Sequence, residues 1–194
     1  MISFAGDVSH SLEISLRSLL ALLFLSVSTW ADGSYEASFG LHAAGNYGVG
    51  AQLKFERATP GSRFKSGAQL LESEAVTVDL FDQDRFELEK HREDLFGLGI
   101  FEILPLDRFR LDAFAGAGAS ILHVREGIPD TSAHPAVGQV IGYRWRASWS
   151  PSATGGLEVG FGRRRTMNVS MVLAGIAATD PLLYLGVLLK FGPL

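Results

Sequence analysis

Residues 182–191 read Leu-Leu-Tyr-Leu-Gly-Val-Leu-Leu-Lys-Phe, and this stretch decides the fold. From Leu183 to Phe191, every second residue is large and apolar. Successive side chains of an extended chain point to opposite faces, so a period of two predicts a β-strand with one apolar face. The other face carries Tyr184, Gly186, Leu188 and Lys190. We interpret the segment as the closing strand of a β-barrel that crosses a membrane.

The same alternation recurs along most of the chain. Residues 35–43 and 47–55 alternate on either side of Gly45 and Asn46, which predicts a hairpin with Tyr47 on the apolar face. In the next clear strand, the pattern predicts that Phe96, Leu98 and Ile100 form the apolar face and that Gly97 and Gly99 oppose it. Further apolar faces run over residues 76–80, 111–121, 143–161 and 167–173. These segments predict an all-β chain that forms a single eight-stranded antiparallel up-and-down transmembrane β-barrel.

The connections differ in length and in charge. Short turns at Pro60, Pro105 and Arg164 are predicted to lie on the periplasmic side, while the charged residues 82–94 and the loop at 125–139 lie on the cell-surface side. Glu72 and Glu74 share the side of the apolar Val76, which predicts a bulge or the membrane boundary near Ala75.

The composition and the N-terminus set further bounds. A length of 194 residues, 47% of them hydrophobic, predicts one folded domain, and a net charge of −4 gives no indication of nucleic-acid binding. The absence of cysteine excludes disulfides and thiolate metal sites. The apolar run at 19–27, followed by Thr29-Trp30-Ala31, predicts a secretory signal peptide over residues 1–31 that is cleaved, leaving the barrel at 32–194.

Alternation alone does not separate a membrane barrel from a soluble barrel such as a lipocalin, because only the direction of the apolar face differs. Seven glycines lie on the polar side of the strands, where a narrow lumen needs small residues beside charged ones. They are Gly48, Gly50, Gly116, Gly118, Gly156, Gly160 and Gly186. This placement favours a membrane barrel with apolar residues outward, and Tyr143, Trp145 and Trp149 then suit an aromatic girdle at the membrane interface.

The charged residues on the inward side are predicted to form a polar network in the lumen. They are Glu36, His42, Lys54, Glu56, Asp79, Arg110, Asp112, Arg144, Arg146, Glu158 and Lys190. Buried charges must pair, so one hypothesis is an ion-paired plug that fills the barrel. The alternative is a narrow path for ions or small solutes.

A lipid-modifying enzyme is a further alternative. A hydrolase needs serine, histidine and an acid within reach of one another. His123 lies near Ser120 and Glu126, and His134 lies near Ser132, but neither group matches the His-x-Ser-Asn motif of the barrel lipid A deacylases. No histidine has a second one at metal-binding spacing. We therefore predict no catalytic residues, no cofactor and no metal site.

The strands at 35–55, 109–121 and 183–191 resemble the small OmpA-like outer-membrane β-barrel family. The spacing of Gly186, Leu189 and Phe191 also resembles the C-terminal signal of such barrels, although Gly192 to Leu194 follow it here. The resemblance implies an integral bacterial outer-membrane protein with a structural, adhesive or surface-interaction role. It implies contacts with outer-membrane lipids, recognition by the barrel-assembly machinery through those three residues, and a surface ligand of unknown identity, if any.

Overall fold

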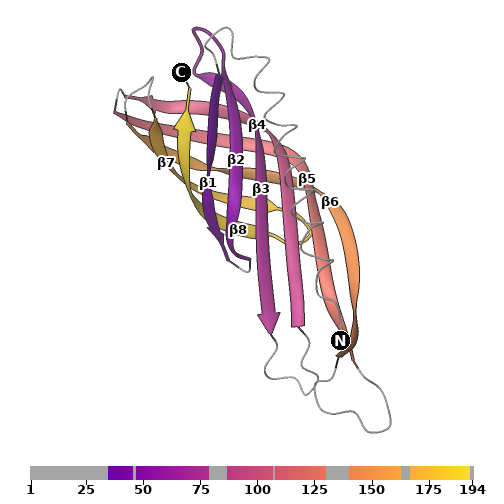
Figure 1. Cartoon of the computed structure of the whole chain (residues 1–194). Helices are drawn as coiled ribbons and strands as arrows, with labels where there is room; N and C mark the ends of the chain where they lie inside the picture. Colours follow the sequence, from indigo (N-terminus) through magenta and orange to yellow (C-terminus); the bar gives the residue numbers. More distant parts are fainter. Residues whose placement is uncertain are drawn as a thin grey trace.

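The computed structural model describes residues 35–45, 47–78, 87–106, 108–129, 140–162 and 167–192, and these residues form a closed antiparallel barrel (Figure 1). Its eight strands follow one another in chain order: β1 (Tyr35–Ala44), β2 (Gly48–Ala58), β3 (Phe64–Val78), β4 (Glu87–Pro105), β5 (Phe109–Pro129), β6 (Val140–Phe161), β7 (Asn168–Ala177) and β8 (Leu182–Phe191). The predicted fold class is confirmed. The predicted signal peptide lies outside the described residues. No helix in these ranges is long and apolar enough to cross a membrane.

The strands are staggered around the barrel. Following the paired residues all the way around the barrel, from Ala177 of β7 through β6 to β1, leads to Phe191 of β8. In the direct pairing of β7 with β8, by contrast, the neighbouring residue Ile176 lies opposite Leu182. A stagger of this kind inclines the strands to the barrel axis. It lets β1 and β8 pair and removes the free edges of the sheet.

β3 to β6 are much longer than the other four strands. β2 pairs with β3 only as far as Ser73, and β7 pairs with β6 only as far as Ala153. Beyond these points, four strands continue past the closed barrel as a sheet on one side of it, at the lower right of Figure 1. We call residues 74–78, 87–93, 121–129 and 140–152 the raised sheet. β3 keeps its register past Ala75, so the alternative of a bulge there is excluded, and the outward positions change from apolar Leu70 to the charged Glu72 and Glu74.

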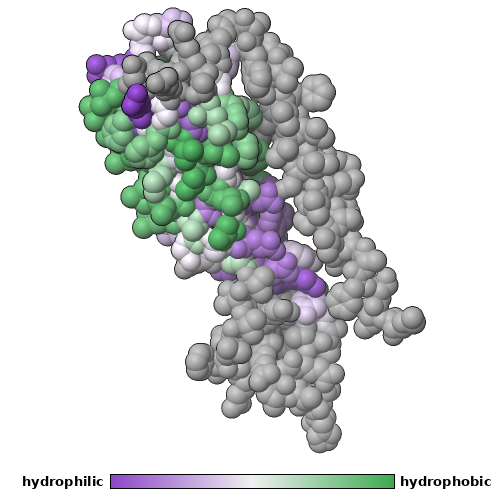
Figure 2. Space-filling view, turned by 60° about the vertical axis from the view of Figure 1, so that its left-hand side comes forward, coloured by the Kyte–Doolittle hydropathy of each residue, from purple (hydrophilic) through white to green (hydrophobic). Residues whose placement is uncertain are grey.

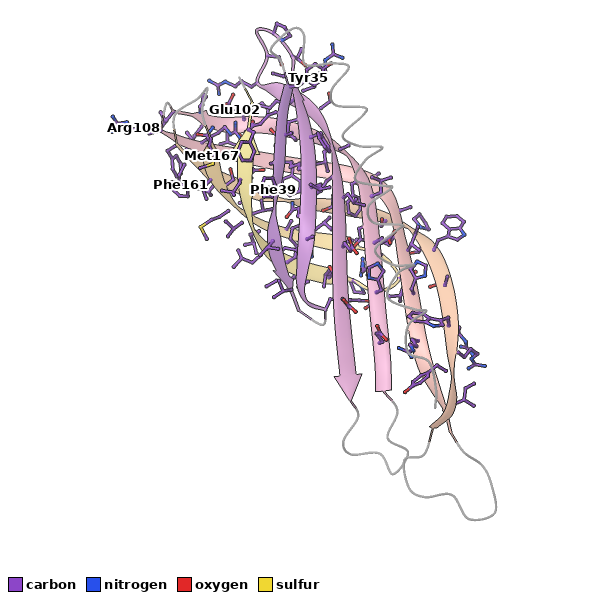
Figure 3. The ribbon with its side chains drawn as sticks, viewed as in Figure 1. Tyr35, Phe39, Glu102, Arg108, Phe161 and Met167 are labelled. Carbon is purple, nitrogen blue, oxygen red and sulfur yellow. The ribbon has the colours of Figure 1, made fainter. Side chains whose placement is uncertain are left out.

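Large apolar side chains cover the outer wall of the closed part of the barrel. Exposed examples include Phe39, Leu41, Val49, Phe64, Leu95, Leu157, Met171, Leu173, Leu183, Leu185 and Val187. Figure 2 shows this surface as a green band with hydrophilic purple surface above and below it, and Figure 3 labels the exposed residues Phe39, Phe161 and Met167. The inward positions hold buried charged and polar residues together with an apolar cluster. This is the inverse of a soluble barrel, and it confirms the outward direction of the apolar face.

The prediction for β4 was wrong. Phe96, Leu98 and Ile100 point into the barrel and are buried, while Gly97 and Gly99 face outward. The charged residues at even positions of the same strand, Arg92 and Asp94 among them, are also inward, so β4 follows one alternation up to Glu102. The presence of an apolar face did not by itself show whether that face points outward or inward, because apolar side chains also fill the part of the lumen that holds no charged residues. Phe114 of β5 is buried in the same cluster.

Glycine on the inner wall is a steric requirement, and we expect Gly118→Ala to destabilise the barrel. A Cβ added at Gly118 would collide with the backbone carbonyl of Leu95, which cannot rotate away. Overpacking of this kind costs on the order of 1–3 kcal/mol of unfolding free energy. The matched control is Gly97→Ala, where the nearest atom is the Ala117 carbonyl oxygen at 3.9 Å. Urea unfolding in lipid bilayers measures both, and equal stability of the two variants contradicts the prediction.

Candidate functional site

Inward side chains from six strands meet as a cluster of ions in the part of the lumen nearest the turns at Pro60 and Pro105. The strand period places every second residue of these strands on the axis side, so charged residues on separate strands converge without being close in sequence. The basic members are Lys54, Lys65, Arg110 and Lys190, and the acidic members are Glu36, Glu56, Asp112 and Glu158. We call these eight residues the ion cluster.

The centre of the ion cluster is inaccessible to solvent and tightly paired. Lys54 Nζ lies 2.6 Å from Glu158 Oε2 and 2.7 Å from Glu56 Oε1. Lys190 Nζ lies 2.9 Å from Glu56 Oε1 and also contacts Glu158. The side chains of these four residues are at most 1% exposed. Each lysine therefore pairs with two carboxylates, on its own strand or on other strands. These ion pairs compensate the cost of removing the charges from water.

Two further cations enclose this centre. Arg110 Nε lies 2.9 Å from Asp112 Oδ2, and its other nitrogens lie 3.4 Å from Glu36 Oε2 and 3.6 Å from Glu158 Oε1. Lys65 Nζ lies 3.5 Å from Asp112 Oδ2. The cluster joins four basic to four acidic side chains, so its formal charge is zero. A neutral network of paired charges can be buried in a narrow barrel, whereas an excess of either sign cannot.

A second closure lies at the mouth of the barrel beside the raised sheet. The Arg92 guanidinium donates to Asp94 Oδ2 at 2.8 Å, to the Asp180 carbonyl oxygen at 2.5 Å and to Ser120 Oγ at 3.3 Å. It also lies over the ring of Tyr47, with 5.6 Å from its central carbon to the ring centroid. Arg92 is 2% exposed, so this contact ties β4 to the turn between β7 and β8 and covers the lumen.

Tyr47 belongs to this mouth and not to the outer wall, where the sequence pattern predicted it. Gly48, the first residue of β2, has a φ of +69°, which breaks the alternation between Tyr47 and the rest of the strand. The Tyr47 ring is therefore fully buried, and its hydroxyl donates to Asp180 Oδ2 at 2.5 Å.

An uncharged polar layer separates the two closures. His42 Nε2 and Ser73 Oγ are 2.7 Å apart, and Gln69 Nε2 donates to the Tyr184 hydroxyl at 2.8 Å. His42 Nδ1 and both polar atoms of the Gln52 side chain have no hydrogen-bond partner among the described side chains. The serine and histidine are paired, but no carboxylate orients the imidazole through Nδ1, and both are 1% exposed inside the lumen. Among the described residues, this arrangement lacks the third group and the substrate access that hydrolysis requires.

The structure places eight of the eleven residues of the predicted lumen network inside the barrel. Seven of them join the ion cluster and His42 lies in the layer beyond it, while Asp79 lies outside the described residues. The prediction was wrong for Arg144 and Arg146, which are exposed on the raised sheet, because β6 continues past the closed barrel at that height. The charged inward residues that the sequence analysis missed are Lys65, Arg92, Asp94 and Glu102, although the alternation along β3 and β4 could have placed them there.

The residues weighed as catalytic do not assemble. Ser120 is inward, where it donates to Asp94, while His123 is on the outward side with its ring centroid 6.0 Å from that of His91. The side chain of Glu126 and the pair Ser132 and His134 lie outside the described residues. Within the described ranges, no three histidine or acidic side chains are arranged to hold a metal ion.

His91 and Glu93 form an ion pair on the outward side of β4, above the membrane-spanning stretch that begins at Leu95. His91 Nε2 lies 3.2 Å from Glu93 Oε1 and 3.7 Å from Glu72 Oε1. The hydrogen bond to Glu93 raises the pKa of His91 above its ordinary 6.5, with Glu72 and Glu74 acting in the same direction against burial. The same bond lowers the pKa of Glu93 below 4.5.

We expect this pair to stabilise the raised sheet most strongly between pH 4.5 and 6.5. A raised histidine pKa gives stability that is fully present below 6.5 and lost as the pH rises through the raised value. A lowered glutamate pKa gives stability that is present above 4.5 and lost as the pH falls through the lowered value. An NMR titration of the His91 ring is the measurement. Glu93→Gln should return the His91 pKa toward 6.5, and Glu74→Gln should change it less. Equal effects of the two variants contradict the assignment of the hydrogen bond as the main cause.

The barrel resembles solved outer-membrane proteins. A major outer membrane protein from Thermus thermophilus superposes with a TM-score of 0.57 at 12% identity, over 81% of this chain and 100% of that one. Structures with lower TM-scores are Ail, the attachment invasion locus protein of Yersinia pestis (0.49, 10% identity, 82% and 95% coverage), and Neisserial surface protein A (0.45, 9% identity, 82% and 97% coverage).

The chain has the fold of an eight-stranded outer-membrane β-barrel. The sequence matches no protein-family model, and no curated protein is significantly similar to it. The structural similarity therefore shows the fold, and the apolar outer wall shows that the barrel lies in a membrane. The protein is a transmembrane β-barrel of the outer-membrane type.

Proposed function

We propose that this protein is a sealed outer-membrane barrel that anchors the raised sheet above the cell surface for interaction. The observation that carries the proposal is the double closure of the lumen, by the ion cluster at one end and by Arg92 at the mouth. In a barrel filled in this way, the side chains of the lumen have a structural role. The parts left to interact with other molecules are the raised sheet and the segments that connect its strands.

A narrow channel is the alternative that the sealed lumen disfavours. An ion crossing the barrel would have to separate Lys54 and Lys190 from carboxylates that lie within 3 Å of them in a dry interior. Breaking a buried ion pair costs about 3–5 kcal/mol, and a path through this cluster breaks several.

We therefore expect no unitary conductance from the protein in planar lipid bilayers. The measurement is single-channel recording at both polarities, with an open porin inserted into the same membrane as the control for detection. Reproducible conductance steps that scale with the amount of this protein would replace the proposal by the channel hypothesis.

The interaction role of the raised sheet can be tested by replacing the segments that connect its strands. Residues 79–86 join β3 to β4 and residues 130–139 join β5 to β6, so short turns can replace both without touching a described strand. Cells that display the native chain should differ from cells with both replacements in attachment to surfaces and to one another. Equal surface content of the two proteins, measured with a tag, is the control. Unchanged attachment counts against an interaction role of these connections.

The enzyme hypothesis has no assembled site to support it among the described residues. Ser120 and His123 lie on opposite faces of β5, and the pair of His42 and Ser73 is enclosed in the lumen, away from lipid. Mass spectra of lipid A from cells with and without the protein test this alternative. We expect identical spectra, and a mass shift that depends on the protein would favour an enzyme.

Assembly into the membrane remains a prediction based on the end of β8. Leu189 and Phe191 face outward, Gly186 faces inward, and the ring of Phe191 stacks on Phe39 of β1 with 5.6 Å between centroids. This seam joins the first strand to the last. We propose that these three residues contact the assembly machinery before the barrel closes.

A further inference from the structure

The outward side of β6 in the raised sheet carries a row of exposed aromatic residues. Tyr143 is 45% exposed, Trp145 is 51% exposed and Trp149 is 76% exposed. Residues of equal parity on one strand share a face, so all three point sideways from the barrel. Figure 3 shows side chains projecting from both faces of this sheet. A group of large exposed rings on one face marks an interaction site.

The pairing of the strands shows that these rings stand above the hydrocarbon layer. A transmembrane strand takes about 9–11 residues, and that length counted back from Phe161 reaches Ala153 to Pro151. Trp145 lies six residues beyond Pro151, which at about 3.3 Å per residue and a tilt of about 40° is a rise of roughly 15 Å.

The residues beside the rings agree with this height. Trp145 pairs with Arg125, and Arg125 pairs with Glu89. Trp149 pairs with Ile121, which pairs with Glu93. Charged residues in these rows do not suit the hydrocarbon layer. Tyr143 and Trp145 therefore lie beyond the hydrocarbon layer, at the height of the headgroups.

Arg125 holds part of this surface in a fixed arrangement. Its guanidinium carbon lies 4.1 Å from the ring centroid of Tyr143 and 5.6 Å from that of Trp145, and its Nη1 donates to Glu89 Oε2 at 3.0 Å. A cation stacked on two rings and held by a carboxylate loses little further freedom on binding. We call Tyr143, Trp145, Trp149 and Arg125 the aromatic platform.

We propose that the aromatic platform binds the sugar residues of glycolipid headgroups in the surrounding outer leaflet. The platform faces sideways above the lipid belt, so the headgroup layer is what lies against it. The C–H face of a pyranose ring stacks on an indole or phenol ring, and the guanidinium can donate to sugar hydroxyl oxygens. Glu72, Glu74 and Glu89 share the outward side of the sheet. Their negative charge disfavours binding through the phosphate groups of the headgroups and favours stacking of the rings on sugars.

This proposal deepens the surface-interaction role by naming a partner for one face of the raised sheet. It rests on the same membrane placement as the proposed function, but it does not require residues 79–86 or 130–139 to bind a ligand. A failure here therefore leaves the attachment experiment unaffected, and the reverse also holds.

Tryptophan fluorescence tests the proposal at single residues. The chain has three tryptophans, and the full chain carrying Trp30→Phe keeps only the two on the platform. Trp149→Phe then leaves Trp145 as the reporter, and Trp145→Phe leaves Trp149. The protein is inserted into bilayers of phospholipid alone, of phospholipid with lipid A, and of phospholipid with lipopolysaccharide that carries its core sugars. Acrylamide quenching measures exposure, and phospholipids with brominated acyl chains measure contact with hydrocarbon.

We expect a severalfold fall in acrylamide quenching of Trp145 only in bilayers with core sugars, and no quenching by brominated chains. Glu89→Gln, which frees Arg125, should reduce this protection. The matched control is Arg57→Met, which removes a similar contact of Arg57 with Tyr35 (5.4 Å) at the other end of the barrel and should change nothing. Three results overturn the proposal: equal acrylamide quenching in all bilayers, strong quenching by brominated chains, or protection that rises with protein density and indicates a second copy.

Discussion

Replacing Lys190 by methionine is expected to lower the unfolding free energy of the barrel by about 3–5 kcal/mol, the cost of breaking a buried ion pair. Lys190 Nζ contacts Glu56 and Glu158, and Glu36 Oε1 lies 4.0 Å away. Methionine fills most of the same volume but leaves these carboxylates with one cation too few in a dry interior. The loss is therefore electrostatic and not a cavity.

Urea unfolding in lipid bilayers measures the effect, and two comparisons make it specific. Lys65→Met removes a lysine at the edge of the cluster, where the carboxylate distances are 3.5 and 3.9 Å, and should cost less. Adding Glu158→Gln to Lys190→Met restores the charge balance, so the double variant should be more stable than the sum of the two single losses. Strict additivity, or a Lys190→Met protein as stable as the native one, contradicts the role assigned to the ion cluster.

Arg92→Met is expected to have the next largest effect, again about 3–5 kcal/mol, because it leaves a buried carboxylate without its partner. Asp94 is fully buried and is held by Arg92 and Ser120. The same substitution removes the link from β4 to the Asp180 carbonyl, so the mouth beside the raised sheet should loosen as well. Amide hydrogen exchange near Asp180 should become faster than in the native protein.

Two variants distinguish the loss of stability caused by Arg92→Met from the loss that removal of any other arginine would cause. Arg125→Met removes a partly exposed pair with Glu89 on the outward side, and surface pairs are worth about 0–1 kcal/mol. Asp94→Asn added to Arg92→Met removes the stranded charge and should recover part of the stability. If Arg125→Met proves as harmful as Arg92→Met, the mouth has no special contribution to stability.

Much of the barrel followed from local pattern. Alternation at Leu183 to Phe191 and over residues 35–55 predicted strands, faces and the membrane, because the two faces of a strand are set by neighbouring residues alone. The inward charges on β1, β2, β5, β6 and β8 followed from the same rule. Where one face is apolar and the other holds charged residues, the sequence is sufficient.

The pattern failed where glycine and not charge opposed the apolar residues, and where a strand leaves the barrel. Phe96, Leu98 and Ile100 could point either way, and only the continuation of β4 through Asp94 and Arg92 fixed them inward. Arg144 and Arg146 have inward parity, but β7 ends before reaching them, so no lumen exists at their height among the described strands.

Sequence by itself determined that the chain alternates into eight strands with an apolar side that meets lipid. Tertiary structure alone decided which charges pair, that Arg92 reaches Asp180 across the mouth, and that four strands rise above the rest. The physical reason is that alternation is a property of consecutive residues, whereas pairing and height depend on the register between strands that are far apart in the chain.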